Sequence, residues 1–285
     1  MATILFDGVA YGMLMFVLAC GLAVTLGLMN FVNLAHGAFA MAGGYVTVIL
    51  MGQWNVPFLA CLPIAFVASA ALGLLLERTL YVHMYGRSHL EQVLFSIGLV
   101  FIAVAAADYF MGSSQRNIQL PAWLQGRREV LGANIGIYRS FLIVVCGALA
   151  LALQLGLMRT RFGSRLRAAV DDARVARGLG IPVGFVFAAT FAVGSGLAGL
   201  GGALGVELLG LDPYFPLKFM IFFLIVVTVG GTSGILGPFL AALMLGVADV
   251  AGKYYLSSAL GSFVIYVVLI VVLVLRPNGL FARAR

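Results

Sequence analysis

Residues 159–182 read RTRFGSRLRAAVDDARVARGLGIP, the only long polar run in a chain that is otherwise mostly apolar. The run contains six arginines and two aspartates, and hydrophobic runs end just before it and begin again just after it. In a membrane protein, loops rich in arginine are retained in the cytoplasm. The stretch therefore predicts a membrane-spanning chain that presents one charged segment to the cytoplasm.

The composition supports the same class of protein. The chain has 285 residues, of which 63% are hydrophobic and 9% are charged, and its mean hydropathy is +1.11. Soluble domains carry about 25% charged residues, so this composition is typical of a polytopic helical membrane protein. The net charge of +7 does not indicate nucleic-acid binding, because the arginines lie in gaps between apolar runs rather than on a basic soluble face.

We expect an all-α fold in which residues 1–285 form a single transmembrane domain, a helical bundle of about eight to nine spans. A span needs about 20 apolar residues, and the last three runs are short or interrupted by glycine. The three cysteines lie within apolar runs and predict small buried side chains rather than disulfides or a metal site. The expected spans are roughly residues 4–28, 34–51, 57–76, 93–111, 140–158, 183–206, 219–229, 239–251 and 263–275.

The arginine distribution also predicts the orientation. The 159–182 segment and the tail arginines (Arg276, Arg283 and Arg285) should lie in the cytoplasm. Counting spans backward from the 159–182 segment then places the N-terminus on the side of the membrane away from the cytoplasm. The same count puts residues 112–139 outside despite their four arginines, in tension with the positive-inside rule, although long loops translocate largely regardless of charge.

Apolar side chains recur at helical spacing through the 159–182 segment, which predicts an amphipathic helix across the cytoplasmic membrane face. They are Leu166, Ala169, Val170, Ala173 and Ala176. On another face, Arg167 and Asp171 are four residues apart and able to pair, and Gly178 and Gly180 should stop the helix. One reading is a surface helix that rests on anionic lipid and binds nothing else. The small alanine face favours the alternative, a helix that docks on a protein.

Three motifs resemble those of one family, the shorter of the two permease types of branched-chain amino acid ABC transporters. The first, residues 33–45, reads NLAHGAFAMAGGY and is similar to the family's N-x-A-H-G followed by a small-residue pair and Tyr. The second, residues 169–181, reads AVDDARVARGLGI, is followed by SGLAGLGGAL from Ser195, and resembles the motif that couples to the ATPase. The third is GGTSGILGP at residues 230–238, with the ending RPNGLF at residues 276–281.

The resemblance implies the membrane half of an importer in the bacterial inner membrane, with its C-terminus cytoplasmic and its N-terminus periplasmic. The chain contains no G-x-x-x-x-G-K-[ST] phosphate loop, so two separate ATPase subunits would hold ATP and Mg, and this chain would hold no cofactor. A second permease, either a copy or a different chain, and a periplasmic solute-binding protein complete the implied assembly. Its solutes are branched-chain or related amino acids, or similar small polar molecules.

The resemblance further implies that the 159–182 segment is a cytoplasmic coupling helix that sits in a cleft of the ATPase and transmits its closure. The residues that would carry this role are Arg167, Ala169, Asp171, Asp172, Ala173, Ala176, Gly178 and Gly180. Membrane lipid is the remaining expected partner, and nucleic acid is not a partner.

Few ionisable residues lie within the expected spans, because charges at the bilayer centre are costly. Ion-coupled transport relies on such groups, so their scarcity argues against it. The candidates for a translocation path are mainly neutral and suit a route opened by conformational change. They are Asn30, Asn33, His36, Gly37, Ser96, Thr190, Ser195, Thr228, Thr232 and Ser233. Asn33 has the alternative role of a helix N-cap, and His36 that of bonding a neighbouring helix.

Three other functions compete with an importer permease. An ion-coupled secondary transporter of a small organic solute should show titratable groups in its spans and paired half-repeats. A membrane-embedded enzyme would need a catalytic site, but His83 and His89 share a loop with no carboxylate at ligand spacing, so we expect a transport subunit and not an enzyme. A channel or structural protein would not depend on an ATPase.

Overall fold

The computed structural model describes the whole chain except residues 30, 131–132, 232–233, 257, 277–278 and 281–285. The described residues form eleven α-helices, two short 3-10 helices and one two-stranded hairpin. The elements are α1 (Ala2–Met29), α2 (His36–Trp54), α3 (Phe58–Thr79), η1 (Tyr81–His83), α4 (His89–Met111), η2 (Ala122–Leu124), β1 (Arg127–Val130), β2 (Ala133–Gly136), α5 (Ile137–Arg159), α6 (Arg161–Asp171), α7 (Ala173–Gly178), α8 (Val183–Leu209), α9 (Phe215–Gly230), α10 (Leu236–Tyr255) and α11 (Ser258–Leu275).

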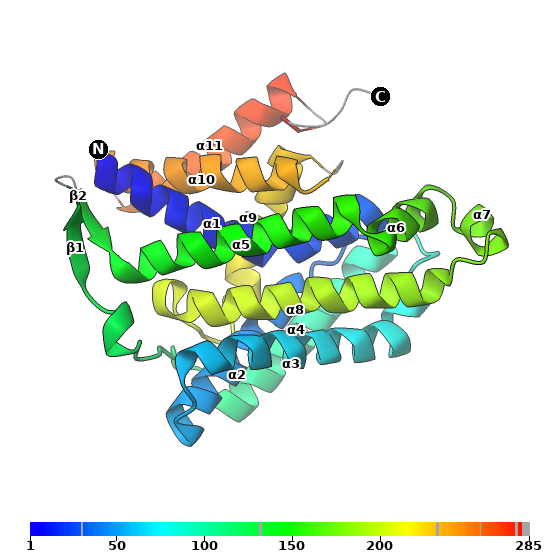
Figure 1. Ribbon diagram of the computed structural model, residues 1–285, viewed down its shortest axis with the longest axis horizontal. Coiled ribbons are helices and arrows are strands. Elements are labelled where there is room, and N and C mark those ends of the chain that lie inside the picture. Colours follow the sequence, from blue (N-terminus) through cyan, green and yellow to red (C-terminus); the bar gives the residue numbers. More distant parts are fainter. Residues whose placement is uncertain (30, 131–132, 232–233, 257, 277–278, 281–285) are drawn as a thin grey trace.

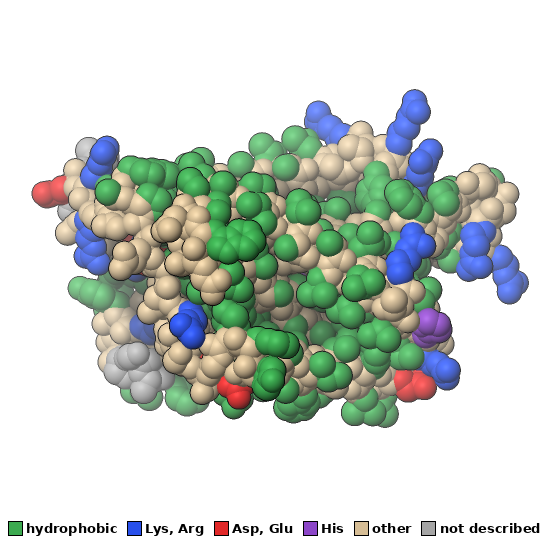
Figure 2. Space-filling model, turned by 90° about the horizontal axis from the view of Figure 1, so that it is seen from below, with side chains coloured by type: hydrophobic (Ala, Val, Ile, Leu, Met, Phe, Trp, Pro, Cys, Tyr) green, Lys and Arg blue, Asp and Glu red, His purple; other side chains and the backbone are tan. Residues whose placement is uncertain are grey.

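The expected helical membrane bundle is confirmed. Within the described residues, six helices (α1, α3, α4, α5, α8 and α10) are long and apolar enough to cross a membrane, and α9 and α11 contain shorter apolar stretches. Helix α2 lies between α1 and α3 in the chain and is not among these eight helices. Hydrophobic side chains cover the middle of the molecule in Figure 2, and charged side chains gather toward its two ends.

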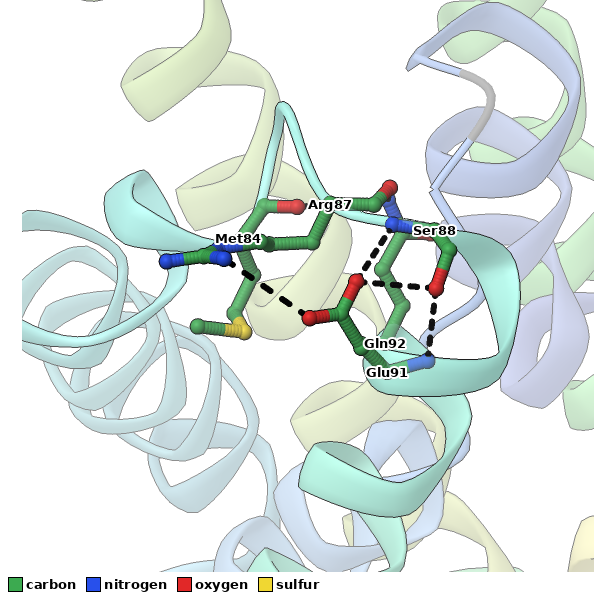
Figure 3. Close-up of polar contacts among 5 residues, drawn as sticks. All are labelled: Met84, Arg87, Ser88, Glu91 and Gln92. Carbon is green, nitrogen blue, oxygen red and sulfur yellow. Dashed lines mark hydrogen bonds and ion pairs between the residues drawn. The ribbon is translucent and has the colours of Figure 1, made fainter.

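Helix α4 extends beyond its expected span because polar residues cap it. Helix α4 begins at His89 instead of residue 93. The Ser88 hydroxyl accepts a hydrogen bond from the Glu91 backbone N–H at 3.3 Å, and the Glu91 carboxylate accepts one from the Ser88 N–H at 2.9 Å (Figure 3). This reciprocal capping satisfies two backbone donors that the helix itself leaves unpaired, so the first turn forms from polar residues that hydropathy alone excludes.

Helix α8 lies at the centre of the bundle, where it packs against α1, α2 and α3. Its glycines let the neighbouring backbones touch: a Cβ on Gly202 would lie 1.8 Å from the carbonyl oxygen of Ala40, and one on Gly43 would lie 2.2 Å from that of Gly199. Close backbone approach through small residues is the usual source of helix association in a bilayer. Of the apolar 18-residue stretch of each helix, 78% is buried in α1 and 61% in α8, against 22% in α4 and 17% in α5. Helices α4 and α5 therefore lie on the outside of the bundle.

The two ends of the bundle differ in structure. The N-terminus and the β1–β2 hairpin lie at one end, and α6 and α7 lie at the opposite end (Figure 1). The hairpin was not expected from the sequence; it pairs Arg127–Val130 antiparallel with Ala133–Gly136. Arg139 at the start of α5 forms an ion pair with Asp7 of α1, and the Arg116 guanidinium donates to the Met111 carbonyl at 2.8 Å. The arginines of this loop are thus partly satisfied within the chain.

Candidate functional site

The 159–182 segment forms two short helices, so the expectation of one continuous amphipathic helix is wrong. The chain turns at Asp172, whose backbone is extended (φ −152°, ψ 103°). Its carboxylate accepts hydrogen bonds from the N–H groups of Arg174 and Val175, at 2.8 and 3.0 Å. Aspartate competes with the helical backbone in this way and therefore favours an N-cap over a helix interior. Helix α6 thus ends at Asp171, and α7 begins directly after the cap.

The small apolar face of the segment packs against its own chain, which corrects the expectation that this face stays open for a partner. Ala169 and Ala176 are 1% and 2% exposed. They form one cluster with Val183 at the start of α8, and Ala173 and Phe187 pack against that cluster. Helices of this length are not stable alone and must bury their apolar face. The alanines therefore attach α6 and α7 to α8.

The opposite face of the segment is exposed. Arg174 and Arg177 point to solvent together with Asp171, and the tip carries two apolar side chains, Val175 and Leu179, that are 57% and 76% exposed.

The sequence also predicted that two glycines stop the helix and that Arg167 and Asp171 are able to pair. Helix α7 ends at Gly178, and Gly180 has a left-handed φ of +79°, so both glycines act as predicted. Arg167 does not pair with Asp171; its guanidinium donates to the carbonyl of Leu157 at the end of α5.

The link between α1 and α2 (residues 31–35) is buried at the same end of the bundle. Asn33 is 1% exposed, and its side-chain oxygen accepts a hydrogen bond from the Tyr81 hydroxyl at 2.9 Å. The N-cap of α2 is Ala35, without a side-chain cap, so the alternative role of Asn33 as an N-cap is wrong. Its amide instead ties the link to η1.

His36 connects three helices. Its Nε2 lies 2.9 Å from the carbonyl oxygen of Leu18 in α1, and because a carbonyl only accepts, Nε2 carries the proton. A Cβ on Gly21 would lie 2.5 Å from the His36 ring and 2.3 Å from the carbonyl oxygen of Gly194 in α8. This supports the interpretation that His36 bonds a neighbouring helix. Gly37 allows a close, though less tight, approach of α9, since a Cβ there would lie 3.0 Å from the Pro216 Cα.

An aromatic cluster that sequence reasoning missed lies between the link and the base of α8. Tyr85 stands edge-on to Phe187 of α8 and to Phe31 of the link, with ring centroids 5.6 and 5.7 Å apart. Its hydroxyl donates to the Glu77 carboxylate of α3 at 2.9 Å. Tyr81 contacts Phe31 at 5.4 Å. The tyrosines of YVHMYG were the available signal, but their partners are distant in sequence.

The loop that carries this cluster is held by Gln92. Its side-chain oxygen accepts a hydrogen bond from the Val32 N–H at 3.2 Å, and its amide donates to the carbonyls of Met84 and Arg87 at 3.3 and 3.2 Å. Burial raises the pKa of Tyr81 and of Tyr85, and the Glu77 carboxylate raises the pKa of Tyr85 further. Both phenols therefore remain protonated donors at physiological pH.

The other predicted path residues are not gathered around one polar site. Three of them bond inside their own helices: Ser96 to Val93, Thr190 to Val186 and Ser195 to Phe191, at 3.0, 2.7 and 2.9 Å. Thr228 is half-buried on α9. Such hydroxyls support packing in this conformation. Three further candidates (Asn30, Thr232 and Ser233) lie outside the described residues.

A charged pair is present in one span. Asp249 of α10 is 2% exposed and lies 2.6 Å from the ammonium of Lys253, four residues later. The ammonium is 5.7 Å from the centre of the Tyr11 ring in α1, which adds a cation–π contact. The two charges neutralise each other near the helix end. This arrangement stabilises the contact of α10 with α1.

These features define a polytopic helical membrane protein with a charged segment exposed at one end. The family described as "Branched-chain amino acid transport system / permease component" matches residues 4–273, so the chain belongs to that family. Three relatives are similar over nearly their whole length. The branched-chain amino acid permease protein LivH of Salmonella typhimurium is 28% identical over 98% of this chain and 94% of its own, BraD of Pseudomonas aeruginosa 28% over 98% and 95%, and a probable LivH of Methanocaldococcus jannaschii 27% over 97% and 91%. No solved structure matches the chain.

Family membership determines the general role. The chain is a transport subunit of an ABC transporter complex rather than an enzyme, and subunits of this family carry no cofactor. It is a multi-pass membrane protein. The shorter permease type expected from the three motifs is confirmed by the full-length similarity to LivH and BraD.

Proposed function

We propose that this chain translocates branched-chain or related amino acids, or similar small polar solutes, across the bacterial inner membrane. A periplasmic binding protein delivers the solute, a second permease (a copy or a different chain) completes the channel, and two ATPase subunits supply the energy. The N-terminus is periplasmic and the C-terminus cytoplasmic. The observation that carries the proposal is the exposed tip of α7, attached to the central helix α8.

The tip is suited to a protein partner rather than to lipid alone. The alanine face is used within the chain, so the surface helix resting on lipid through that face is disfavoured. What remains outside is a small apolar patch, Val175 and Leu179, surrounded by Arg174 and Arg177. A central apolar contact with a charged rim is the usual form of a protein interface. We assign this patch to the ATPase.

Movement of the tip reaches the membrane through α8. Helices α6 and α7 pack on Val183, Phe187 one turn later contacts Tyr85, and Tyr85 contacts Phe31 in the α1–α2 link. A shift of α8 relative to α3 would strain the bond from Tyr85 to Glu77. We propose that Asn33, His36 and Gly37 close the inner end of the translocation path, together with Ser96, Thr190, Ser195 and Thr228.

The test is substrate-stimulated ATP hydrolysis of the purified complex. Leu179→Asp places a charge in the centre of the patch, and we expect loss of the ATPase subunits or at least a tenfold weaker association, because truncated central apolar contacts cost about 2 kcal/mol or more. Leu256→Asp is the matched control, since Leu256 is also exposed, at 60%, after α10. Retention of full stimulated activity by Leu179→Asp would contradict the assignment, and uptake that continues without ATP would favour ion coupling.

A further inference from the structure

An apolar groove of about 370 Å³ lies between α5 and α8, in the half of the bundle nearer α6. Leu149, Leu153 and Leu157 of α5 form one wall, and Val193 and Leu197 of α8 form the other. Val24 of α1 and Phe66 of α3 also line it, and Phe162 of α6 stands at its inner end. The core of the bundle therefore forms the floor of the groove, and the 159–182 segment closes its end nearer α6.

The side chains of the lining offer a ligand no free hydrogen-bond donor. Its two hydroxyls are already bonded: Thr160 donates to the Gly156 carbonyl at 2.5 Å, and Thr190 donates to the Val186 carbonyl at 2.7 Å. A zwitterionic solute would lose its hydration there without compensation, which costs several kcal/mol. The apolar lining therefore suits a hydrocarbon ligand rather than the transported solute.

The length of the groove matches one leaflet. From Leu149 to Thr160 the chain advances eleven residues, roughly 16 Å at about 1.5 Å per residue. Half of a bilayer hydrocarbon core is about 15 Å. Helix α5 is also among the least buried spans, with 17% of its apolar 18-residue stretch buried. The groove therefore opens on the outer surface of the helical bundle.

Positive charge lies at the inner end of the groove. The Arg167 guanidinium donates to the carbonyl of Leu157, which itself lines the groove. A guanidinium has five N–H donors, so most of its hydrogen-bonding capacity remains open. Arg161 is exposed beside Phe162. Guanidinium groups match phosphate geometry through paired N–H donors, and basic pockets between helices bind anionic headgroups.

We propose that this groove binds one acyl chain of an anionic phospholipid of the cytoplasmic leaflet, with the lipid phosphate held by Arg161 and Arg167. The leaflet assignment follows from the proposed orientation; the binding itself does not depend on the transported solute. Because Phe162 is part of α6, the bound chain also packs against the 159–182 segment. The lipid is then a structural component that supports the segment from the membrane side.

A substitution whose side chain fills the groove tests the proposal without disturbing the core. Gly156 lines the groove, and a Cβ built on it meets no atom within 4 Å, so the side chain of Gly156→Leu enters the groove without a clash. Gly98→Leu on α4 is the matched control, because its Cβ also meets nothing within 4 Å. The intact complex is reconstituted in vesicles of phosphatidylglycerol and phosphatidylethanolamine, extracted again, and its retained phospholipids are counted by native mass spectrometry.

We expect the wild type and Gly98→Leu to retain phosphatidylglycerol, and Gly156→Leu to retain at least tenfold less, since expelling two methylene groups already weakens binding about tenfold. The double variant Arg161→Gln with Arg167→Gln should lose the preference for phosphatidylglycerol over phosphatidylethanolamine. Equal retention by Gly156→Leu and the wild type would overturn the proposal. Dissociation of the second permease from Gly156→Leu, with lipid retention unchanged, would also overturn it and identify the groove as a permease interface.

Discussion

The α1–α2 link and the 159–182 segment each combine small residues with polar ones, but the link is buried and the tip of the segment is exposed. Asn33 of the link and His36, directly after it, bond within the chain, and the adjacent glycines bring helices into contact. In the segment, alanines bury one face while Val175 and Leu179 remain outside. The difference teaches that similar residue types can have different roles: the buried polar groups fix helix packing, and the exposed apolar groups form the patch that we propose for the ATPase.

The largest effect should come from breaking the glycine contacts on the buried side. Gly202→Val places a branched side chain where even a Cβ would lie 1.8 Å from the Ala40 carbonyl oxygen. The clash is with backbone atoms, so no flexible side chain can move to relieve it. We expect the free energy of unfolding to fall by more than about 3 kcal/mol. Gly184→Val on the same helix is the control, because a Cβ there meets nothing within 4 Å. The measurement is the yield of folded protein by size-exclusion chromatography in detergent; equal yields of the two variants would disprove the close contact.

The next effect concerns the buried histidine. His36→Ala removes the hydrogen bond to the Leu18 carbonyl and leaves a cavity, with an expected loss of about 2–3 kcal/mol in the free energy of unfolding. His89→Ala is the control, since His89 is exposed at the start of α4, and surface changes usually stay within about 0.5 kcal/mol. Thermal unfolding of the detergent-solubilised protein compares them. Similar midpoints for both variants would show that the bond contributes nothing to stability.

A smaller and more specific effect is expected where the two regions meet. Tyr85→Phe keeps the ring contacts with Phe187 and Phe31 but removes the bond to Glu77. One hydrogen bond contributes about 0.5–1.5 kcal/mol, so we expect solute moved per ATP hydrolysed to fall about two- to tenfold, with the complex still assembled. The control is Tyr109→Phe, because Tyr109 is 83% exposed. A transport-to-hydrolysis ratio unchanged in Tyr85→Phe would contradict transmission through this residue.

The smallest effect separates Gly178, the last residue of α7, from Gly180, which follows the helix. Gly180→Ala forces a side chain into a left-handed backbone, φ +79°, at a cost of about 1 kcal/mol. Gly178→Ala lies within the helix and should stabilise it by up to about 1 kcal/mol. Hydrogen exchange of residues 173–179 should therefore become faster in the first variant and slower in the second. The same direction of change in both would show that the turn does not require glycine.

Sequence patterns predicted the helices best where they were long and apolar. The expected span at residues 183–206 corresponds to α8 at Val183–Leu209, because no charged residue interrupts it. Capping was harder to predict: Ser88 and Glu91 extend α4 into a polar stretch, and Asp172 divides the 159–182 segment. Both outcomes depend on a side chain accepting a backbone N–H, a local competition that hydropathy does not report.

The candidate site was predicted by residue identity but not by arrangement. The motif around Asn33 and His36 was identified, yet the partners of these residues, Tyr81 and the carbonyl of Leu18, could not be found from spacing. Ser96, Thr190 and Ser195 were expected along a path, and in the structure each bonds within its own helix. A polar residue in a span has several ways to satisfy its hydrogen bonds, and only the neighbouring helices decide among them.

The sequence by itself determined the class of this protein and where along the chain its charged segment falls, because hydropathy and charge are properties of the chain read in order. Its motifs indicated the family. Tertiary structure decided which faces are available. It turned Ala169 and Ala176 inward and left Leu179 outside, joined Tyr85 to Glu77 and Phe187, and opened a groove between α5 and α8. These outcomes depend on contacts between segments far apart in the chain, where packing against a particular neighbour, rather than residue type, determines which surface remains free.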